Sequence, residues 1–244
     1  MKLVKQLKVL TLQVTISLIF LNTQFSLAQK KINWEGPYVG LGIQSLDGDM
    51  NGRFKSNNNL HSKDITGKST EFLIGYNNNL TYYGINDYII GLELSYSDKD
   101  FLLNNTKSKR DCPGTSYDCK SSINYSWSAK TKLGFKYENF LPNLFLGYTE
   151  HQITIRTDLK ENIVFDPGFH ASNLEGSTQK VGGVLYGMGL DYYFNSNFFI
   201  SVSYIETQMN KKEFHLKNSG NVKTELKYNA NKVALNYHFW FTLF

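Results

Sequence analysis

The sequence is poor in several features that would point to other kinds of protein. Beyond the first 28 of its 244 residues, it has no apolar run near the roughly 20 residues of a membrane-spanning helix, so any membrane crossing must be made by strands. It has four prolines against 19 glycines, 16 tyrosines and 17 phenylalanines, which suits many strands joined by turns. Its formal net charge is +5 and falls to +2 without the first 28 residues, and this near balance gives no support to nucleic-acid binding. One all-β domain accounts for the whole length.

The first 28 residues predict a secretory signal peptide. Lys2, Lys5 and Lys8 precede an apolar run over 9–21, and the small residues Ser26 and Ala28 stand at the usual cleavage spacing. An uncleaved membrane anchor is the alternative, but the run is short and polar residues interrupt it. Cleavage after Ala28 removes three lysines and no acid, so the charge falls from +5 to +2 and residues 29–244 form the mature chain.

The chain has two cysteines, Cys112 and Cys119, with six residues between them in a polar segment. In an exported chain this arrangement predicts a local disulfide that closes a loop, and two free thiols are the alternative. A metal site on these cysteines lacks nearby histidines, and the five histidines show no paired metal spacing. We therefore expect no metal and no cofactor.

Residues 122–137 alternate between two kinds of side chain. One set is apolar or aromatic apart from one threonine, and comprises Ile123, Tyr125, Trp127, Ala129, Thr131, Leu133, Phe135 and Tyr137. The other set is small or cationic, and comprises Ser122, Asn124, Ser126, Ser128, Lys130, Lys132, Gly134 and Lys136. As a strand this segment has two distinct faces, whereas a helix would spread both sets around its circumference.

The same alternation predicts eight strands, over 38–43, 71–76, 88–96, 122–137, 144–156, 184–193, 198–204 and 232–239. Long polar connections over 47–67, 97–121, 157–177 and 208–223 alternate with short turns. An antiparallel up-and-down transmembrane β-barrel has this layout, with every long loop at one end. Two details stay open: residues 80–83 extend either neighbouring strand, and a bulge within 144–156 would reconcile its two apolar phases.

The apolar face is expected to contact lipid. A soluble lipocalin-like barrel also has eight strands, but large side chains from every strand would overfill so narrow an interior. The opposite face offers small residues and mixed charges, which fit inside. Aromatic residues stand toward the ends of the apolar face, like the interfacial girdles of a lipid-facing barrel: Tyr88, Tyr96, Tyr125, Tyr137, Phe198 and Tyr204.

Glu93, Lys130 and Lys132 stand on the small or charged face of neighbouring predicted strands. We predict that their charges pair inside the lumen and fill it, because aqueous channels belong to larger barrels of roughly 16–18 strands. A small porin or narrow solute channel is the alternative.

Several segments resemble the porin-family, OmpA-like outer-membrane β-barrel proteins of Gram-negative bacteria. The clearest is the Gly-x-Gly-x-acid-Tyr strand over 187–192, followed by an Asn turn and an aromatic-led strand that ends at Tyr204. Segments 34–40, 91–96, 127–137 and 231–239 agree with it. The chain departs from the family pattern at Ser203, where an acid is usual, and in continuing beyond Phe239. The resemblance implies an outer-membrane location, a structural or surface-interaction role, and recognition of the last strand by the barrel-assembly machinery.

No catalytic residue is predicted, so we expect no enzyme. Nucleophilic catalysis requires a Ser beside a His that is oriented by an acid, and the suggestive pair Glu150-His151 has no identifiable Ser partner. A lipid-modifying barrel enzyme is the third alternative, after the surface protein and the porin.

Cationic residues gather in two of the predicted long loops. Lys107, Lys109 and Arg110 lie in one, and Lys211 and Lys212 lie in another. They are candidate contacts for lipopolysaccharide phosphates, and solvated loop charges are the alternative. Outer-membrane lipid and lipopolysaccharide are thus the expected partners, whereas nucleic acid is not expected, and the sequence names no extracellular partner.

Overall fold

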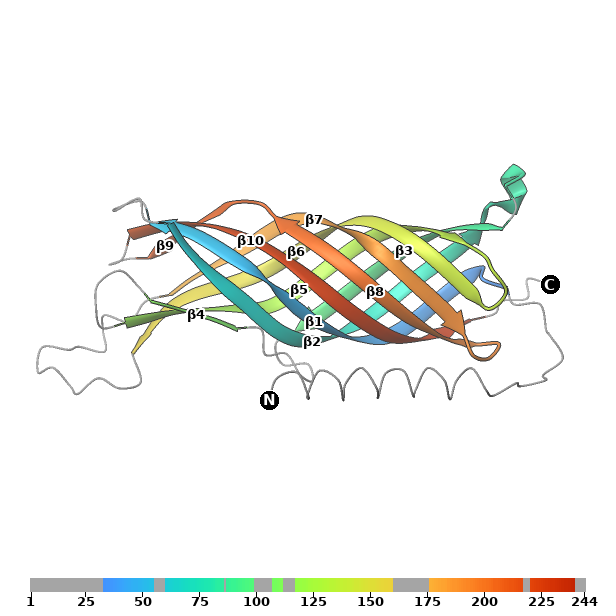
Figure 1. Ribbon diagram of the computed structural model, residues 1–244, viewed down its shortest axis with the longest axis horizontal. Coiled ribbons are helices and arrows are strands. Elements are labelled where there is room, and N and C mark those ends of the chain that lie inside the picture. The colour runs from blue at the N-terminus through green and yellow to red at the C-terminus, as the bar shows by residue number, and fades with distance from the viewer. Residues whose placement is uncertain are drawn as a thin grey trace, which may run out of the picture. The chain divides into compact units, whose positions relative to one another are not determined.

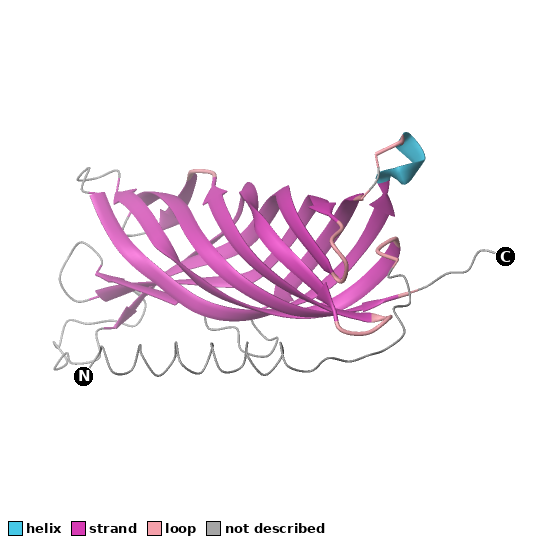
Figure 2. Ribbon diagram, turned by 45° about the vertical axis from the view of Figure 1, so that its right-hand side comes forward, coloured by secondary structure: helices cyan, strands magenta, loops and turns pink. Residues whose placement is uncertain are grey.

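The computed structural model describes residues 33–54, 60–85, 87–98, 107–111, 117–159, 176–216 and 220–239. They form a closed, eight-stranded antiparallel barrel, as predicted (Figure 1, Figure 2). Its strands are β1 (Gly36–Phe54), β2 (Leu60–Asn79), β3 (Tyr88–Asp98), β5 (Tyr117–Phe135), β6 (Phe140–Leu159), β7 (Gly176–Tyr193), β8 (Phe198–Met209) and β10 (Gly220–His238). Two short strands continue β3 and β8 beside their neighbours, namely β4 (Lys107–Asp111) and β9 (Lys212–Leu216).

The barrel closes because β1 pairs with both β2 and β10. From Trp127 on β5, the directly paired residue on β6 is Glu150. In the other direction, the residues paired in turn with Trp127 run through β3, β2, β1, β10, β8 and β7. This path reaches β6 at Phe140, which is ten residues from Glu150. This stagger accompanies a strand tilt of roughly 35–45°, and an interior of this size is just wide enough for side chains to fill.

The turn between β2 and β3 contains one short 3-10 helix, η1 (Leu80–Tyr83), so residues 80–83 extend neither strand. The Asn79 side chain accepts a hydrogen bond from the Thr81 backbone N–H at 3.1 Å. Gly84 ends the helix in the left-handed conformation, with φ of 75°, which glycine adopts without steric cost. Among the described residues, no helix is long and apolar enough to cross a membrane.

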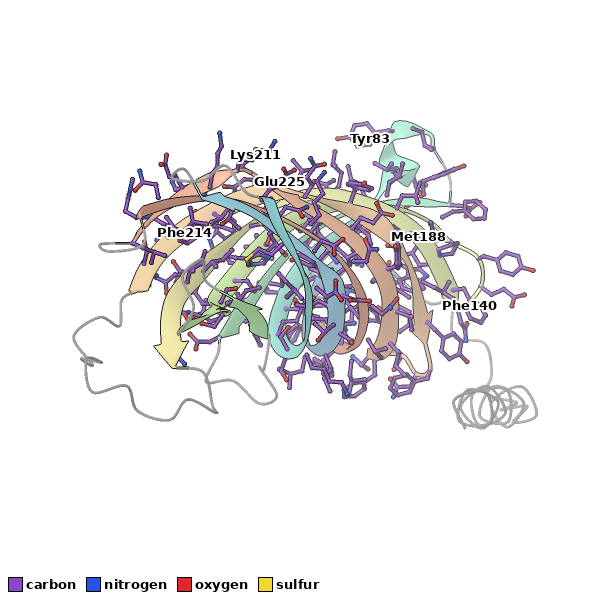
Figure 3. The ribbon with its side chains drawn as sticks, turned by 60° about the vertical axis from the view of Figure 1, so that its left-hand side comes forward. Tyr83, Phe140, Met188, Lys211, Phe214 and Glu225 are labelled. Atoms are coloured by element: carbon purple, nitrogen blue, oxygen red, sulfur yellow. The ribbon has the colours of Figure 1, made fainter. Side chains whose placement is uncertain are left out.

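An apolar belt surrounds the barrel on the half that carries the short turns. It consists of the outward-facing apolar residues of 39–43, 72–76, 88–96, 127–135, 140–148, 184–192, 198–204 and 233–237. Leu92 and Met188 are 63% and 60% exposed, and Figure 3 shows Met188 and Phe140 pointing away from the barrel. The belt covers nine residues of β3, close to the roughly 9–11 of a tilted spanning strand. The predicted outward orientation of the apolar face is confirmed in this half.

Several strands continue far beyond the belt, so the prediction of a long loop over 47–67 is wrong. β1 has 19 residues and β2 has 20, and the two remain paired from Gly36↔Asn77 to Arg53↔Leu60. Parts of 97–121, 157–177 and 208–223 are strands as well. We call the strand segments beyond the belt, 45–54, 60–70, 107–111, 117–126, 149–159, 176–183, 206–216 and 220–231, the extension.

Side-chain polarity is inverted in the extension. Polar residues such as Asp47, Lys180 and Lys227 face outward there, and apolar residues face inward. Its inward apolar residues pack into one buried cluster with Phe145, Leu185 and Ile205 from the adjoining edge of the belt. The residues that the extension contributes are Leu46, Met50, Ile65, Ile153, Ile155, Val181, Met209, Phe214, Leu226, Tyr228 and Ala230. β6 has 20 residues, about ten more than the belt needs, so the extension rises on the order of 25 Å above the belt. It has the side-chain distribution of a water-soluble barrel.

A β-bulge lies on β5 rather than within 144–156. The β5–β6 register shifts between Ile123 and Tyr125, which pair with the consecutive residues Ile153 and Gln152. The β6–β7 pairing is uninterrupted from Arg156↔Gly176 to Phe140↔Tyr192. The bulge turns Ile123 inward against the apolar cluster, so its predicted place on the lipid-facing side is wrong. The two apolar phases of β6 are real, and they reflect the change from lipid outside to a dry interior.

Candidate functional site

The lumen at the level of the belt contains the three charged residues expected there. Glu93 on β3 pairs directly with Lys130 on β5, and Lys130 Nζ lies 2.9 Å from Glu93 Oε1. Lys132 Nζ lies 3.7 Å from Glu93 Oε2. All three side chains are about 5% exposed, and they point inward because they alternate with outward residues of the belt.

Three further charged residues join this group, which we call the charge layer. Lys132 Nζ lies 3.3 Å from Asp191 Oδ2 on β7, and Lys232 on β10 lies 3.2 Å from Glu93 and 2.6 Å from Glu71. The sequence did not reveal Asp191, Lys232 and Glu71 as partners, although each stands at an inward position of its strand. The layer therefore holds three carboxylates and three ammonium groups, which balance in formal charge.

The charge layer is also packed and hydrogen-bonded to its surroundings. The Tyr38 hydroxyl donates to Glu93 Oε2 at 2.8 Å. Lys130 Nζ lies 4.4 Å from the centre of the Phe145 ring, and Lys132 Nζ lies 4.9 Å from the centre of the Tyr38 ring. Removing charges from water costs several kcal/mol per ion, and only such pairing offsets it. The layer can hold the strands together and occupy the lumen.

A layer of aromatic side chains fills the lumen on the short-turn side of the charge layer. Trp34 is 1% exposed, and the centre of its ring lies 4.4 Å from the ring centre of Tyr193 and 6.1 Å from that of Phe199. Tyr193 Oη lies 2.7 Å from Nδ1 of the buried His238. The Tyr38 ring packs against the Phe199 ring, and the ring centres of Phe199 and Tyr193 are 5.1 Å apart. These rings close the short-turn end of the barrel.

Gly75 makes room for the Tyr38 ring inside the narrow lumen. A Cβ atom at Gly75 would lie 2.2 Å from Cζ of Tyr38, which is far inside van der Waals contact. Any larger residue at this position displaces the ring that hydrogen-bonds Glu93. Interior glycines in this barrel thus relieve crowding.

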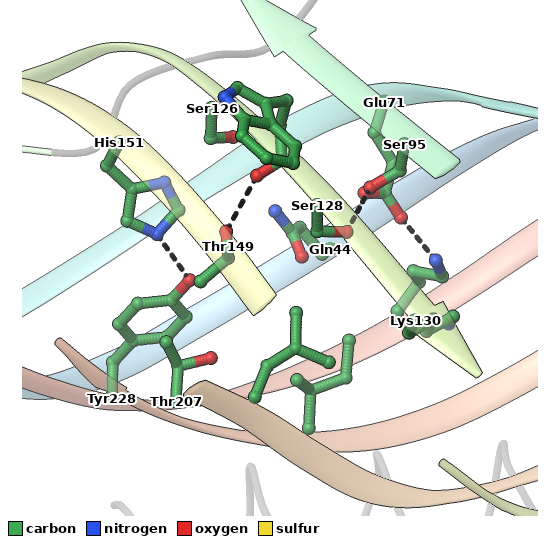
Figure 4. Close-up of a pocket in the computed structure, with 14 residues that line it drawn as sticks. Gln44, Glu71, Ser95, Ser126, Ser128, Lys130, Thr149, His151, Thr207 and Tyr228 are labelled. Carbon is green, nitrogen blue, oxygen red and sulfur yellow. Dashed lines mark hydrogen bonds and ion pairs between the residues drawn. The ribbon is translucent and has the colours of Figure 1, made fainter. Parts of the chain in front are cut away.

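A small polar cavity of about 30 Å³ lies between the charge layer and the apolar cluster (Figure 4). Its lining includes Lys130, Glu71, Thr207, His151 and Tyr228. This volume has room for one water molecule. His151 Nε2 lies 2.7 Å from the Tyr228 hydroxyl, and Nδ1 of His151 has no partner among the described residues. His151 lies beyond Tyr148, the last belt residue of β6, and burial lowers the pKa of its imidazole to about 4.

Glu150 and His151 do not form a catalytic pair. Glu150 faces outward, where Trp127 Nε1 donates to its Oε1 at 3.3 Å, whereas His151 is buried in the lumen against Tyr228. Adjacent residues of a strand point to opposite faces, so no third group can align the two. Within the described ranges, no group of three or more His, Cys, Asp or Glu residues is placed to hold a metal ion.

The other predicted site residues that the structure describes lie at the long-connection end of the barrel. Lys107, Lys109 and Arg110 belong to β4, where only the course of the backbone is described, as it is for Cys119 in β5. Cys112, residues 1–28 and residues 240–244 lie outside the described residues. Lys211 Nζ lies 3.3 Å from Glu225, which also lies 3.3 Å from Lys227 (Figure 3), while Lys212 is exposed at the start of β9.

Solved barrels of similar fold come from several bacteria. OprG from Pseudomonas aeruginosa is 13% identical, with a TM-score of 0.52, and the match covers 84% of this chain and 96% of OprG. Neisserial surface protein A is 16% identical with a TM-score of 0.43, over 84% of this chain and 97% of that protein. Ail of Yersinia pestis is 12% identical with a TM-score of 0.42, over 84% and 99%. OprG supports the fold alone.

No curated protein matches the sequence. A family model described as outer membrane protein beta-barrel domain matches residues 15–239. The match covers nearly the whole chain, including every described strand, and agrees with the closed barrel and its apolar belt. The chain therefore belongs to the outer-membrane β-barrel domain family.

Proposed function

We propose that this outer-membrane protein is a closed, non-catalytic barrel with a structural or surface-interaction role. The observation that carries the proposal is the filling of the lumen by three successive layers. These are the aromatic layer around Trp34, the charge layer around Glu93 and the apolar cluster around Phe214. A solute would have to displace all three.

A small porin is the alternative that this filling disfavours. The charge layer has equal numbers of carboxylates and ammonium groups, so it presents no uncompensated charge to attract an ion. The cavity beside it holds about one water molecule rather than a continuous column. A dry apolar cluster on one side of that cavity is a barrier to ions.

The surface role is supported by the extension. Outer-membrane barrels have short periplasmic turns and longer extracellular connections, and this rule supports an extracellular position for the extension. There its polar outer face, on the order of 25 Å high, adds a rigid surface to the loops. Lys107, Lys109 and Arg110 belong to this end and are proposed contacts for anionic groups of lipopolysaccharide.

Conductance in a planar bilayer tests the closed barrel. Folded protein should give no steady single-channel current, whereas a large porin added to the same bilayer should. A gel-mobility shift on boiling should first confirm that the sample is folded. Steady conductance from the folded fraction would reject the closed barrel in favour of the porin. Release of fatty acid from labelled phospholipid, absent in a boiled sample, would instead establish an enzyme.

Export and assembly complete the proposal. Cleavage after Ala28 and a disulfide between Cys112 and Cys119 are both testable by mass spectrometry of protein purified from the outer membrane. The expected mass begins at Gln29 and falls by two hydrogens relative to the reduced chain. Depletion of the barrel-assembly machinery should remove the boiling-sensitive form from the membrane if the last strand, with Phe239, is its recognition element.

A further inference from the structure

One part of the extension's outer face carries a connected set of amide and hydroxyl groups. Asn124 Nδ2 on β5 donates to Gln152 at 3.2 Å and to Thr154 at 2.9 Å, both on β6. The Thr154 hydroxyl lies 2.8 Å from that of Thr178 on β7. We call these four residues the polar ladder. Both Nδ2 hydrogens of Asn124 are used in these contacts, and its Oδ1 accepts from the Ser122 hydroxyl at 3.5 Å. The Gln152 amide keeps its two donors, and the threonine hydroxyls both donate and accept.

The bulge on β5 creates this face. Since Ile123 turns inward, Asn124 and Tyr125 both stand on the outer side, although they are adjacent in sequence. Bulges often re-aim side chains at functional positions, and here the bulge adds an amide next to an aromatic ring.

Aromatic rings join the polar ladder to the belt. Tyr125 stacks on Tyr96, with ring centres 6.4 Å apart and planes 24° apart, and Lys180 Nζ lies 5.9 Å from the centre of the Tyr125 ring. Trp127 and Tyr148 pair immediately below, with centres 5.7 Å apart. The face therefore passes from aromatic to amide, hydroxyl and cationic groups in the direction away from the membrane.

The opposite side of the extension lacks this combination. The outward residues of β10 and β1 there include Asn229, Asn231, Lys227, Ser45 and Asp47, and none of the described ones is aromatic. Lys227 pairs with Glu225 at 3.3 Å, whereas exposed Lys180 contacts the ring and hydroxyl of Tyr125, with the Glu150 carboxylate near enough to act on its charge. The two sides thus share a height above the belt but differ in chemistry.

We propose that the polar ladder, with Tyr125 and Lys180, binds the phosphorylated sugar headgroup of a lipopolysaccharide molecule in the surrounding outer leaflet. This inference rests on the proposed function, in which the extension lies on the extracellular side of the outer membrane. The face continues directly from the lipid belt, so its occupant must itself be anchored in the membrane. Sugar rings offer hydroxyls to the amides and a flat apolar side to Tyr125, and Lys180 complements a phosphate.

Matched variants on the two sides of the barrel test the proposal. Gln152→Leu and Lys180→Gln alter the polar-ladder face, whereas Gln208→Leu and Lys227→Gln make the same changes on other outward faces of the extension. Each folded variant is reconstituted in phosphatidylcholine nanodiscs and titrated with fluorescent lipopolysaccharide. We expect about fivefold or greater weakening for each of the first two variants and less than twofold for the controls.

Two ligand arms identify the group that is recognised. Lipid A stripped of its core sugars should bind wild-type protein at least fivefold more weakly than intact lipopolysaccharide, and phosphatidylglycerol should not compete. Equal binding of lipid A, or equal losses in the ladder and control variants, would overturn the proposal. Conductance of the same preparation is measured separately, so failure of the closed barrel and failure of this binding site are distinguishable.

Discussion

Lys130 Nζ lies 2.9 Å from the Glu93 carboxylate in the middle of the lumen, and Lys232 lies 3.2 Å from the same carboxylate. Glu93→Gln should therefore leave buried ammonium groups short of one negative charge. We expect a loss of about 3–5 kcal/mol in the free energy of unfolding, measured by urea titration in lipid vesicles. Adding Lys130→Met to the variant should recover part of this loss, because it restores equal charge. A change under about 1 kcal/mol in the single variant would show that the charges are not coupled.

Three lysine substitutions along β10 test the inversion of polarity. Leu235→Lys places a charge in the belt and should cost roughly 2–4 kcal/mol. Leu226→Lys places a charge in the apolar cluster of the extension and should cost at least as much. Asn229→Lys on the outer face of the extension should stay within about 0.5 kcal/mol. Equal tolerance at Leu226 and Asn229 would contradict a packed extension.

Deleting Asn124 should leave the faces of β5 above the bulge unchanged, because Ile123 and Tyr125 already pair with the consecutive residues Ile153 and Gln152 of β6. The test uses Ile123→Cys in a background with both native cysteines replaced by serine. We expect slow maleimide labelling both with the bulge present and after the deletion, because Ile123 packs against the apolar cluster and the deletion only removes the unpaired residue. Fast labelling in either protein would place Ile123 on the outer face and contradict the register shift between Ile123 and Tyr125.

His151 should make the extension sensitive to acid. Burial lowers the pKa of its imidazole to about 4, so the folded state holds a neutral ring while the unfolded chain takes up a proton below about pH 6.5. The free energy of unfolding should thus fall by up to about 3 kcal/mol between pH 6.5 and 4, and this contribution should be constant above and below that window. Urea midpoints against pH measure it. His151→Gln keeps a partner for Tyr228 and should flatten the dependence; an unchanged slope would assign it to other groups.

The membrane-facing half of the fold was predictable because one simple rule governs it. Lipid outside and a narrow polar lumen inside force strict alternation, and segments such as 88–96 and 184–193 show it without interruption. Glu93, Lys130 and Lys132 followed from the same alternation. Asp191 did not, because it reaches Lys132 across the lumen from a strand that is not its neighbour, and strand position alone cannot reveal such a pair.

The extension escaped prediction because it obeys the opposite rule. On β1, apolar residues move from Leu41 and Ile43 to Leu46 and Met50, which lie on the other face. Few large side chains are needed to fill the interior of the extension, and charged residues separate them along the sequence. The resulting pattern is typical of a polar loop. On β6 the same reversal, from Leu146 to Ile153, mimics a bulge. Tertiary surroundings, rather than any local change of the chain, account for both errors.

Unbroken pairing between β1 and β2 through the extension allows its height to be changed by paired deletions. β1 and β2 stay in register from the belt to Arg53↔Leu60, without a bulge between them. Because side chains alternate with a period of two, removing two residues from each strand keeps every remaining side chain on its own face. Each such step would lower the barrel by about 5 Å and leave the charge layer untouched. The protein could thus be fitted to surface coats of different depth without redesigning its membrane-spanning half.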